Sequence, residues 1–160
     1  EAWERAGCPG RLTVLGGPPP VGEAVDVAAL VEGGVSRPET VDIVGEVSDI
    51  APYVADADVL VLPSDDPEPF GLVVIEAFAL GRPVIASRGG GPVEIIEHGH
   101  NGWLYDLGDA GALAELLAGV TPAEVRIASE HARETYDRRF RPDRYRRQIA
   151  EALSAELQIA

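Results

Sequence analysis

The sequence contains no lysine and no methionine, and it has a single cysteine, Cys8. Because all 13 basic residues are arginine, a Walker-type phosphate lysine and a Schiff-base lysine are excluded within these 160 residues. One cysteine excludes an internal disulfide and a cysteine-based zinc site, and it suits a reducing cytoplasm. Without methionine, Glu1 is not expected to be a translated start, so we interpret the chain as part of a longer protein.

Positive charge is also scarce. The 13 basic residues stand against 27 acidic residues, which leaves a net charge of −14. This balance argues against a general nucleic-acid surface or an anionic-membrane surface, because such binding needs cationic charge at the phosphates. No apolar run reaches the roughly 18 residues that a membrane-spanning helix requires. With 46% apolar residues, the chain can still fill one core, and we expect a single domain over 1–160.

Short apolar runs separate predicted helices along the first two thirds of the chain. The runs are Leu12 to Leu15, Val41 to Val44, Val59 to Leu62, Pro83 to Ala86 and, shorter, Gly102 to Tyr105. The predicted helices cover about 23–33, about 48–56 and about 71–80. Runs that are apolar on both faces are typical of parallel strands covered by helices above and below. We therefore expect a Rossmann-like, doubly wound parallel α/β sheet with the last run at its edge.

The last third of the chain is predicted to be helical. Asp109 is expected to cap a helix that runs through Leu117. Residues 121–124 (Thr-Pro-Ala-Glu) form a capping box with proline at the first helical position, so a second helix should begin there. Pro142 ends that helix, and a last helix is predicted over about 143–157.

Arginines gather in this helical part. Residues 126–147 hold eight arginines and four acids, a local charge of +4. Such a cluster suits solvated helices, or alternatively a docking surface for an acidic partner or for another part of the same polypeptide. His131 lies in this stretch without an identifiable partner. His98 and His100 are interpreted as a surface turn rather than a metal site, since no third ligand accompanies them.

The loop after the third apolar run carries the most chemical information. This loop follows the carboxyl end of a predicted buried strand. Open α/β sheets bind ligands at the carboxyl ends of their strands. Glu68 stands between Pro67 and Pro69, which restrict its backbone. A helix begins near Gly71, and the free N–H groups of a helix N-terminus can bind phosphate. This loop suits either a rigidly placed carboxylate at a ligand site or an ordinary solvated acid.

Glu76 is the only charged residue between Phe70 and Gly81. An ionised carboxylate in an apolar setting is costly unless it is hydrogen-bonded. Glu76 therefore lies either at the solvent-facing edge of the helix or at a ligand whose hydroxyl groups, such as a ribose diol, donate to it.

Five ordered segments together resemble a known family. Glu68 and Glu76 are separated by seven residues, an E-x7-E pattern. The other segments are Val41-Asp-Ile-Val-Gly45, Ala57-Asp-Val-Leu-Val-Leu-Pro-Ser64, Gly90-Gly-Pro-Val-Glu94 and His100-Asn-Gly-Trp-Leu104. Over roughly residues 10–118 the chain resembles retaining glycosyltransferases of the GT-B fold, the group 1 family that includes sucrose-synthase-like and mannosyltransferase-like enzymes. The resemblance is to the C-terminal, donor-binding domain.

The resemblance implies a role for each site residue. Glu68 would be the catalytic carboxylate near the anomeric carbon of the transferred sugar, and Glu76 would accept hydrogen bonds from the ribose. The remaining donor-binding residues would be Phe70, Gly71 and Leu72, through their backbone N–H groups at sugar hydroxyls and phosphate, and Glu46 and Val47, beside the base. No metal and no cofactor are expected, since the nucleotide-diphosphate sugar is itself the substrate.

The resemblance also implies a hexosyltransferase that transfers with retention in the cytoplasm. Its partners would be the sugar donor and an N-terminal acceptor-binding domain of the same polypeptide, and any peripheral membrane contact would belong to the full-length protein. The first strand of the domain, which in the family bears the arginine and lysine that bind the diphosphate, would precede Glu1, so the chain alone should be inactive. The Gly16–Pro20 turn, rich in proline, is not expected to cradle phosphate.

Two other functions stay open at this stage. The chain could be a nucleotide-binding module without transfer activity, or a GT-B-like sugar-nucleotide epimerase. The paired glutamates favour the transferase.

Overall fold

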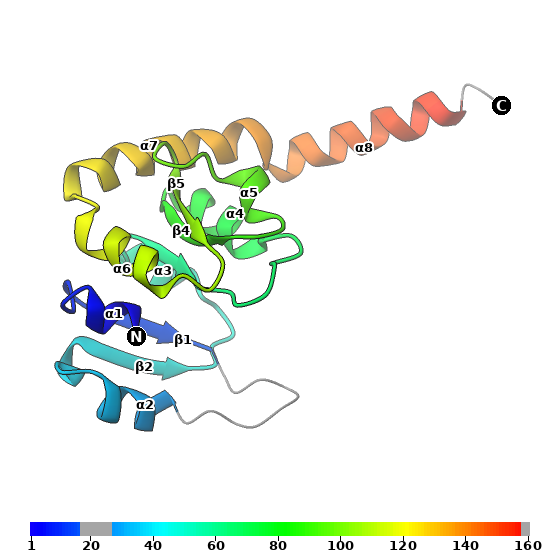
Figure 1. The fold of residues 1–160 in the computed structure, drawn as a ribbon. Helices are drawn as coiled ribbons and strands as arrows, with labels where there is room; N and C mark the ends of the chain where they lie inside the picture. The colour runs from blue at the N-terminus through cyan, green and yellow to red at the C-terminus, as the bar shows by residue number, and fades with distance from the viewer. Residues whose placement is uncertain (17–26, 158–160) are drawn as a thin grey trace.

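The computed structural model describes residues 1–16 and 27–157, in which strands and helices alternate along the chain (Figure 1). The strands are β1 (Leu12–Leu15), β2 (Val41–Gly45), β3 (Leu60–Leu62), β4 (Val84–Arg88) and β5 (Gly102–Asp106). The helices are α1 (Ala2–Arg5), α2 (Val27–Gly34), α3 (Ala51–Asp56), α4 (Leu72–Ala79), α5 (Pro92–Ile95), α6 (Ala110–Gly119), α7 (Pro122–Arg139) and α8 (Pro142–Leu157), with a 3₁₀ turn η1 (Pro38–Thr40). The five predicted strands are confirmed; α1 and η1 were not predicted.

The strands are parallel, but they belong to two sheets. Strand β1 pairs with β2, where Leu12 lies opposite Val41. Strands β3, β4 and β5 form the second sheet in that order, with Leu60 opposite Val84 and Val84 opposite Gly102. The edge position predicted for β5 is confirmed. Among the described residues no ladder joins β1 to β3, so the continuous sheet expected from the sequence is divided at this point.

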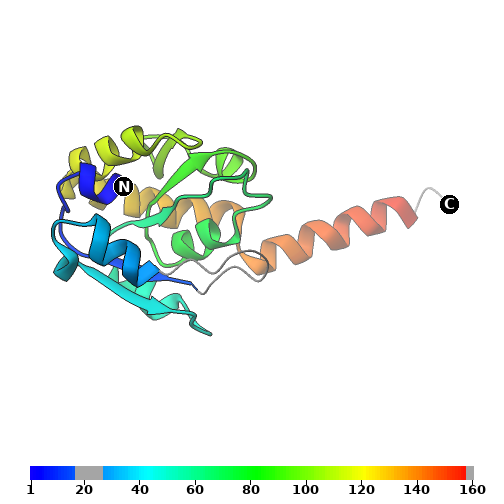
Figure 2. The ribbon, with the colours of Figure 1, turned by 60° about the horizontal axis from the view of Figure 1, so that its bottom comes forward.

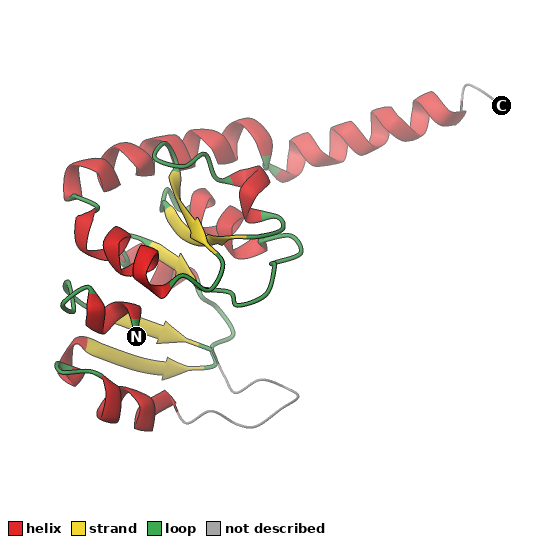
Figure 3. Cartoon of the chain, viewed as in Figure 1, coloured by secondary structure: helices red, strands yellow, loops and turns green. Residues whose placement is uncertain are grey.

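Helices cover both faces of the three-stranded sheet, which is the doubly wound arrangement predicted for this chain (Figure 3). Alternate residues of β4 point into two cores, Val84 and Ala86 into one and Ile85 into the other. Phe78 of α4 packs in the first core and Leu113 of α6 in the second. The predicted α/β class is confirmed, and its cause is the run of apolar residues that β4 buries on both faces.

Helix α4 is held rigidly because it is buried between the sheet and α7. Val74, Ala77 and Phe78 are 0% exposed. The helix begins at Gly71, whose φ of 80° is a left-handed conformation that favours glycine. At the other end, Arg133 of α7 donates a hydrogen bond to the carbonyl oxygen of Ala79. The helix therefore offers a fixed frame for side chains at its amino end.

The predicted caps of the C-terminal helices are confirmed. The Asp109 side chain accepts a hydrogen bond from the N–H of Ala112 at 2.9 Å, at the start of α6. At the start of α7, Glu124 N–H donates to the Thr121 hydroxyl at 3.3 Å, and Thr121 N–H donates to the Glu124 carboxylate at 2.8 Å. The bond from Thr121 N–H lowers the pKa of Glu124 below its ordinary value. These reciprocal bonds fix where α7 begins.

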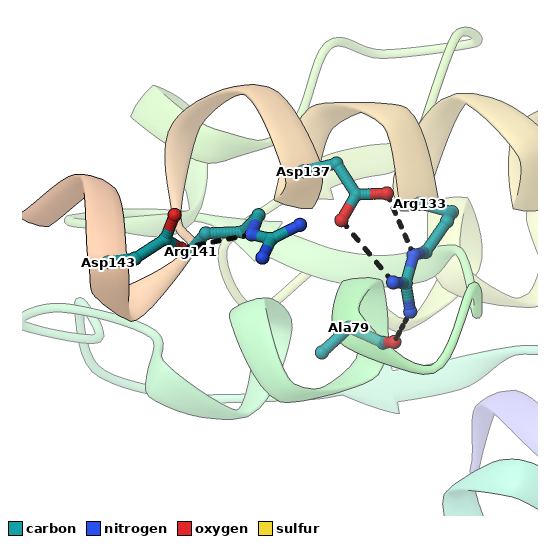
Figure 4. A network of polar contacts seen from close by, with 5 residues as sticks. All are labelled: Ala79, Arg133, Asp137, Arg141 and Asp143. Carbon is teal, nitrogen blue, oxygen red and sulfur yellow. Dashed lines mark hydrogen bonds and ion pairs between the residues drawn. The ribbon is translucent and has the colours of Figure 1, made fainter.

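Some of the clustered arginines have partners inside the chain, as Figure 4 shows. Arg133 donates to both carboxylate oxygens of Asp137, at 3.0 and 3.3 Å, while it also holds Ala79. Arg141 donates to Asp143 at 3.0 Å, at the junction of α7 and α8. Part of the arginine-rich stretch thus attaches α7 to α4 and shapes the junction with α8.

Helix α8 projects away from the rest of the molecule (Figures 1 and 2). Tyr145, Ile149 and Leu153 follow one another at intervals of four residues on one face of this helix, and they are 63%, 42% and 60% exposed. An apolar stripe this exposed is unusual on a helix, because the apolar face of a helix normally packs against a core. None of the described helices has the length and apolar character needed to cross a membrane.

Asn101 ties α5, β5 and α7 together from a fully buried position. Its side-chain oxygen accepts from Glu97 N–H at 2.8 Å, and its amide donates to the Thr135 hydroxyl at 3.2 Å. We expect Asn101→Ala to lower the free energy of unfolding by about 2–3 kcal/mol, because both groups lose their partner. Chemical denaturation measures this, with the exposed amide variant Gln148→Ala as control. A loss below about 0.5 kcal/mol would contradict it.

Candidate functional site

The loop between β3 and α4 lies beside the loop that follows β4. Residues 63–71 leave the carboxyl end of β3, and residues 89–91 leave the carboxyl end of β4. Backbone pairing joins the two loops, since Glu68 forms an isolated parallel bridge with Gly90 and Gly91 N–H donates to the Glu68 carbonyl at 2.8 Å. Neighbouring loops at the carboxyl ends of parallel strands are the usual place for a ligand in this class of fold.

Glycine is required at two positions of this loop pair. A Cβ atom on Gly90 would lie 2.0 Å from the carbonyl oxygen of Glu68, and one on Gly91 would lie 2.1 Å from that of Phe70. Real Cβ atoms essentially never approach another atom within 3.0 Å. In the triple-glycine segment 89–91, the N–H of Gly91 already donates to the Glu68 carbonyl oxygen. This segment packs closely against the loop of residues 63–71, which we call the acidic loop.

The Glu68 carboxylate turns back to the start of α4. Its Oε1 accepts a hydrogen bond from Gly71 N–H at 3.2 Å, and the side chain is half-buried. A carboxylate at a helix N-terminus is stabilised by the free N–H groups and the helix dipole. The N–H of Gly71, predicted to face a ligand, therefore has an internal acceptor in this structure. Whether it binds phosphate or sugar stays a prediction.

Glu76 lies on α4, on the same helix that Glu68 caps. Its side chain is exposed, whereas Ala77 beside it is fully buried. Among the described residues the side chain of Glu76 forms no hydrogen bond and no ion pair. Both readings of this residue, a solvated acid or a ligand-binding carboxylate, agree with that position. Its role at a ribose stays a prediction.

Two large apolar side chains are exposed next to Glu68. Phe70 is 57% exposed and Leu72 is 63% exposed, on either side of the buried Gly71. Apolar side chains at the rim of a loop that also carries a carboxylate are consistent with a surface that another molecule covers. Both residues were predicted to bind the donor through their backbone N–H groups, and no role was predicted for their side chains.

Glu46 and Val47 follow the carboxyl end of β2, in the other sheet. Glu46 is exposed and Val47 is half-buried. Figure 1 shows the arrowheads of β1, β2 and β3 on the same side of the molecule, so the loop that follows β2 and the loop that follows β3 leave from one edge of the fold. The described contacts do not bring them together. The Gly16–Pro20 turn begins at the same edge, but residues 17–20 lie outside the described part of the chain.

No pattern in the sequence predicts the electrostatic interaction between Tyr105 and Asp65. Tyr105 is 6% exposed on β5. Burial raises the pKa of its hydroxyl, and the negative charge of Asp65 in the acidic loop raises this pKa further. The charge of Asp65, in the loop after β3, is therefore felt at Tyr105 on β5. Nothing in the sequence pairs these two residues, because they lie 40 positions apart.

His131 has a partner, contrary to the expectation from the sequence. Its ring stacks on that of His100 with centroids 3.8 Å apart, and its Nδ1 lies 3.1 Å from the His100 carbonyl oxygen. His98 accepts a hydrogen bond from Leu104 N–H at 3.0 Å. Within residues 1–16 and 27–157 there is no group of three or more histidine, cysteine, aspartate or glutamate side chains placed to hold a metal.

Two recesses lie away from the acidic loop. One of about 470 Å³ lies between β5 and α6 and is lined by Trp103, Tyr105 and Glu115 among others. The second, of about 490 Å³, lies at the junction of α7 and α8 beside Arg133 and Arg141. Neither is lined by Glu68 or Glu76. A ligand site that includes both glutamates stays a prediction.

Comparison with known proteins identifies the family to which most of this chain is similar. The model of the family described as "Glycosyl transferases group 1" matches residues 2–121. Among curated proteins, the chain is 36% identical over 102 residues to the N-acetyl-alpha-D-glucosaminyl L-malate synthase of Bacillus anthracis, which is 62% of this chain and 26% of that protein. It is 36% identical over 112 residues to the amylovoran biosynthesis glycosyltransferase AmsK of Erwinia amylovora, 66% of this chain and 28% of that protein. The chain thus spans about a quarter of the length of these relatives.

Solved structures share the fold. A complex of Anabaena Alr3699/HepE with UDP superposes with a TM-score of 0.81 and 28% identity, over 96% of this chain and 44% of that one. The sucrose-phosphate synthase of Thermosynechococcus elongatus superposes with a TM-score of 0.78 and 32% identity, over 99% of this chain and 42% of that one. The Rossmann-like fold assignment is confirmed by these likenesses.

Proposed function

The chain belongs to the glycosyl transferases group 1 family, and from this premise we propose that it is the nucleotide-sugar-binding part of a glycosyltransferase that moves a sugar from a nucleotide diphosphate to an acceptor. One observation carries the proposal. The chain superposes over 96% of its length on a protein solved in complex with UDP. Its two glutamates, on the loop and helix at the carboxyl edge of the sheet, support the same proposal.

The proposed roles follow the position of each residue. Glu76, which is exposed and unpaired within the described part of the chain, accepts hydrogen bonds from the ribose hydroxyls. The backbone at Phe70, Gly71 and Leu72 meets sugar hydroxyls and phosphate at the start of α4. Glu46 and Val47, at the end of β2, lie beside the base. These assignments rest on the resemblance and on the edge that the residues share.

Glu68 is the proposed catalytic residue. Its backbone is held between two prolines and paired with Gly90, so the backbone that carries the carboxylate is fixed in place. We assign it electrostatic stabilisation of positive charge that develops at the anomeric carbon, rather than nucleophilic attack. The acceptor attacks the anomeric carbon on the face that the diphosphate leaves, so the bond to the acceptor forms with retention as the bond to the diphosphate breaks. The leaving diphosphate takes up the proton that the acceptor loses, and no metal takes part. The reaction takes place in the cytoplasm.

Further parts of the enzyme are proposed to lie outside this chain. An N-terminal domain of the same polypeptide supplies the acceptor site, and an arginine and a lysine before Glu1 neutralise the diphosphate. The exposed stripe of α8 and the neighbouring arginines are the surface proposed to contact that domain. We call this chain together with its own upstream residues the extended polypeptide. Hexosyl transfer is assigned to the extended polypeptide, and the 160-residue chain is expected to be inactive.

Titration calorimetry with UDP, GDP and ADP tests the donor site. We expect the extended polypeptide to bind one of them, and Glu76→Ala to weaken that binding about 10- to 100-fold, because a charge-assisted hydrogen bond to the ribose is lost. Glu130→Ala, which removes an exposed carboxylate from α7, is the matched control and should leave the affinity unchanged. Equal affinity of Glu76→Ala and the parent would contradict the assignment. Binding without sugar transfer to any acceptor would favour a nucleotide-binding module instead.

A further inference from the structure

Strand β5 ends the three-stranded sheet, and among the described residues no further strand pairs with its outer edge. The turn that precedes β5 occupies part of this edge instead. Gly99 N–H donates to the Gly102 carbonyl oxygen at 2.8 Å, and His98 forms an isolated parallel bridge with Gly102. The next outward N–H along the strand, that of Leu104, donates to Nδ1 of the His98 ring at 3.0 Å. A side chain therefore closes the β5 edge beyond the backbone bonds of the turn.

The bond from Leu104 N–H determines the protonation state of the His98 ring. A backbone N–H is only a donor, so Nδ1 of His98 must offer its lone pair, and the single proton of the neutral ring is on Nε2. A second proton would occupy Nδ1 and remove the acceptor. The His98 residue is exposed, so water can deliver that proton. This bond at the β5 edge therefore exists only while His98 is neutral.

The other two histidines of the chain lie close by but respond differently to a proton. His131 Nδ1 lies 3.1 Å from the His100 carbonyl oxygen, which can only accept, so this nitrogen carries a proton and a second proton goes to Nε2. Because their rings stack with centroids 3.8 Å apart, this pair is the alternative source of a pH response. The fully buried Asn101 attaches the same turn to α7 through the Thr135 hydroxyl. Protonation of His98 therefore acts on the β5 edge without detaching the whole turn.

Carboxylates share a recess of about 470 Å³ with His98, between β5 and α6. The ionisable groups that line it with His98 are Tyr105 and Asp106 of β5, Glu115 of α6 and Glu124 of α7, and Glu97 and His100 flank His98 in its own turn. Asp106 already pairs with Arg88 at 3.3 Å, and Glu124 accepts from Thr121 N–H at 2.8 Å. Among the described residues the Glu115 side chain forms no hydrogen bond and no ion pair. Glu115 is thus the carboxylate in the recess that is free to pair with a charged imidazole.

We propose that His98 is a pH-dependent switch with two positions. In the neutral form, its Nδ1 accepts the hydrogen bond from Leu104 N–H and closes the outer edge of β5. In the protonated form, the ring can no longer accept, and it turns across the recess to pair with the Glu115 carboxylate. Leu104 N–H is then a free donor at a sheet edge, the kind of group to which a strand of another molecule can add. The switch belongs to the β5 edge and does not depend on the donor site.

NMR of the extended polypeptide, without nucleotide, tests the neutral position. At about pH 7.5, the ¹⁵N chemical shifts of the His98 ring should show Nδ1 without a proton and Nε2 with one. We also expect His98→Ala to speed hydrogen exchange of the Leu104 amide about 10-fold relative to that of Tyr105, whose N–H faces β4 because N–H groups alternate along a strand. A proton on Nδ1, or an unchanged Leu104 rate in His98→Ala, would overturn the proposal.

The ratio of the Leu104 exchange rate to the Tyr105 rate, followed with pH, tests the switch itself. The ratio removes the pH dependence that all amides share. In the parent it should rise about 10-fold between about pH 7.5 and about pH 5, the range in which histidine takes up its proton. In His98→Ala it should be high at both values. Glu115→Gln should move the rise to lower pH, because the charged ring loses its partner, whereas Glu151→Gln, at an exposed glutamate of α8, should not.

Each of these comparisons can fail in a recognisable way. A constant ratio in the parent, while the ring shifts show that His98 becomes protonated, would overturn the switch. A rise that persists in His98→Ala and disappears in His100→Asn would assign the pH response to the stacked pair of His100 and His131 instead. A rise at the same pH in Glu115→Gln as in the parent would overturn the charged position.

Discussion

Gly91→Ala is expected to lower the free energy of unfolding by about 3 kcal/mol and to abolish donor binding in the extended polypeptide. The added Cβ would lie 2.1 Å from the carbonyl oxygen of Phe70 and 2.4 Å from its carbonyl carbon. These are backbone atoms, which cannot move aside as a flexible side chain can, so the acidic loop must shift. Gly90→Ala should act similarly through Glu68 and adds the strain of a φ of 66°. Chemical denaturation and calorimetry with the nucleotide measure both effects.

The chain offers a matched control for each of these variants. Gly99 has a φ of 76° and open space around its Cβ position, so Gly99→Ala reports the backbone strain alone, about 1 kcal/mol. Gly119 has open space and no left-handed φ, so Gly119→Ala should be neutral. The loss in free energy of unfolding caused by Gly90→Ala must exceed that of Gly99→Ala by at least about 1 kcal/mol, and the loss caused by Gly91→Ala must exceed that of Gly119→Ala by as much. If they match them, the two loops are not clamped as described.

Glu68→Gln in the extended polypeptide is expected to reduce the rate of sugar transfer about 100- to 1,000-fold while leaving the fold intact. The amide oxygen of glutamine can still accept the hydrogen bond from Gly71 N–H, but the negative charge proposed to stabilise the transition state is lost. Glu68→Ala loses the charge and the hydrogen bond, so it should lose stability as well as rate. Turnover is measured with the donor that calorimetry identifies.

A comparison of the two Glu68 variants separates catalysis from support of the loop. Unfolding of Glu68→Gln at the same denaturant concentration as the parent, with slow turnover, would agree with an electrostatic role. Glu130→Gln, which makes the same substitution at an exposed glutamate of α7, is the control and should retain full activity. Near-normal turnover of Glu68→Ala would remove Glu68 from the reaction.

Local signals in the sequence were sufficient to place most elements. The Thr121–Glu124 capping box and the Asp109 cap each depend on residues three positions apart, and the structure has both. The β4 strand was recognised from its continuous apolar run, which both cores bury. Helix α1 was missed because it has a single turn and no capping side chain. Such a helix depends on its contact with α6, which no local pattern records.

Long-range pairing explains what the sequence could not predict. The break between β1 and β3 depends on which strands are neighbours, and apolar runs say only that each strand is buried. The two glutamates were found because charge is rare in an apolar helix and because prolines flank Glu68. The contact between Gly91 and Phe70 needs coordinates, although three consecutive glycines at the end of a strand were a signal of close approach. The partner of His131 was missed for the same reason.

The bond from Gly71 N–H to Glu68 has a consequence for any anion that arrives at the start of α4. The N–H of Gly71 at this helix end already donates to the Glu68 carboxylate, so an incoming phosphate would take this donor by exchange rather than by simple addition. Releasing the carboxylate would free it to turn toward the incoming molecule. Binding of an anion at the start of α4 and release of the Glu68 carboxylate would then occur together, because both depend on the hydrogen bond from Gly71 N–H.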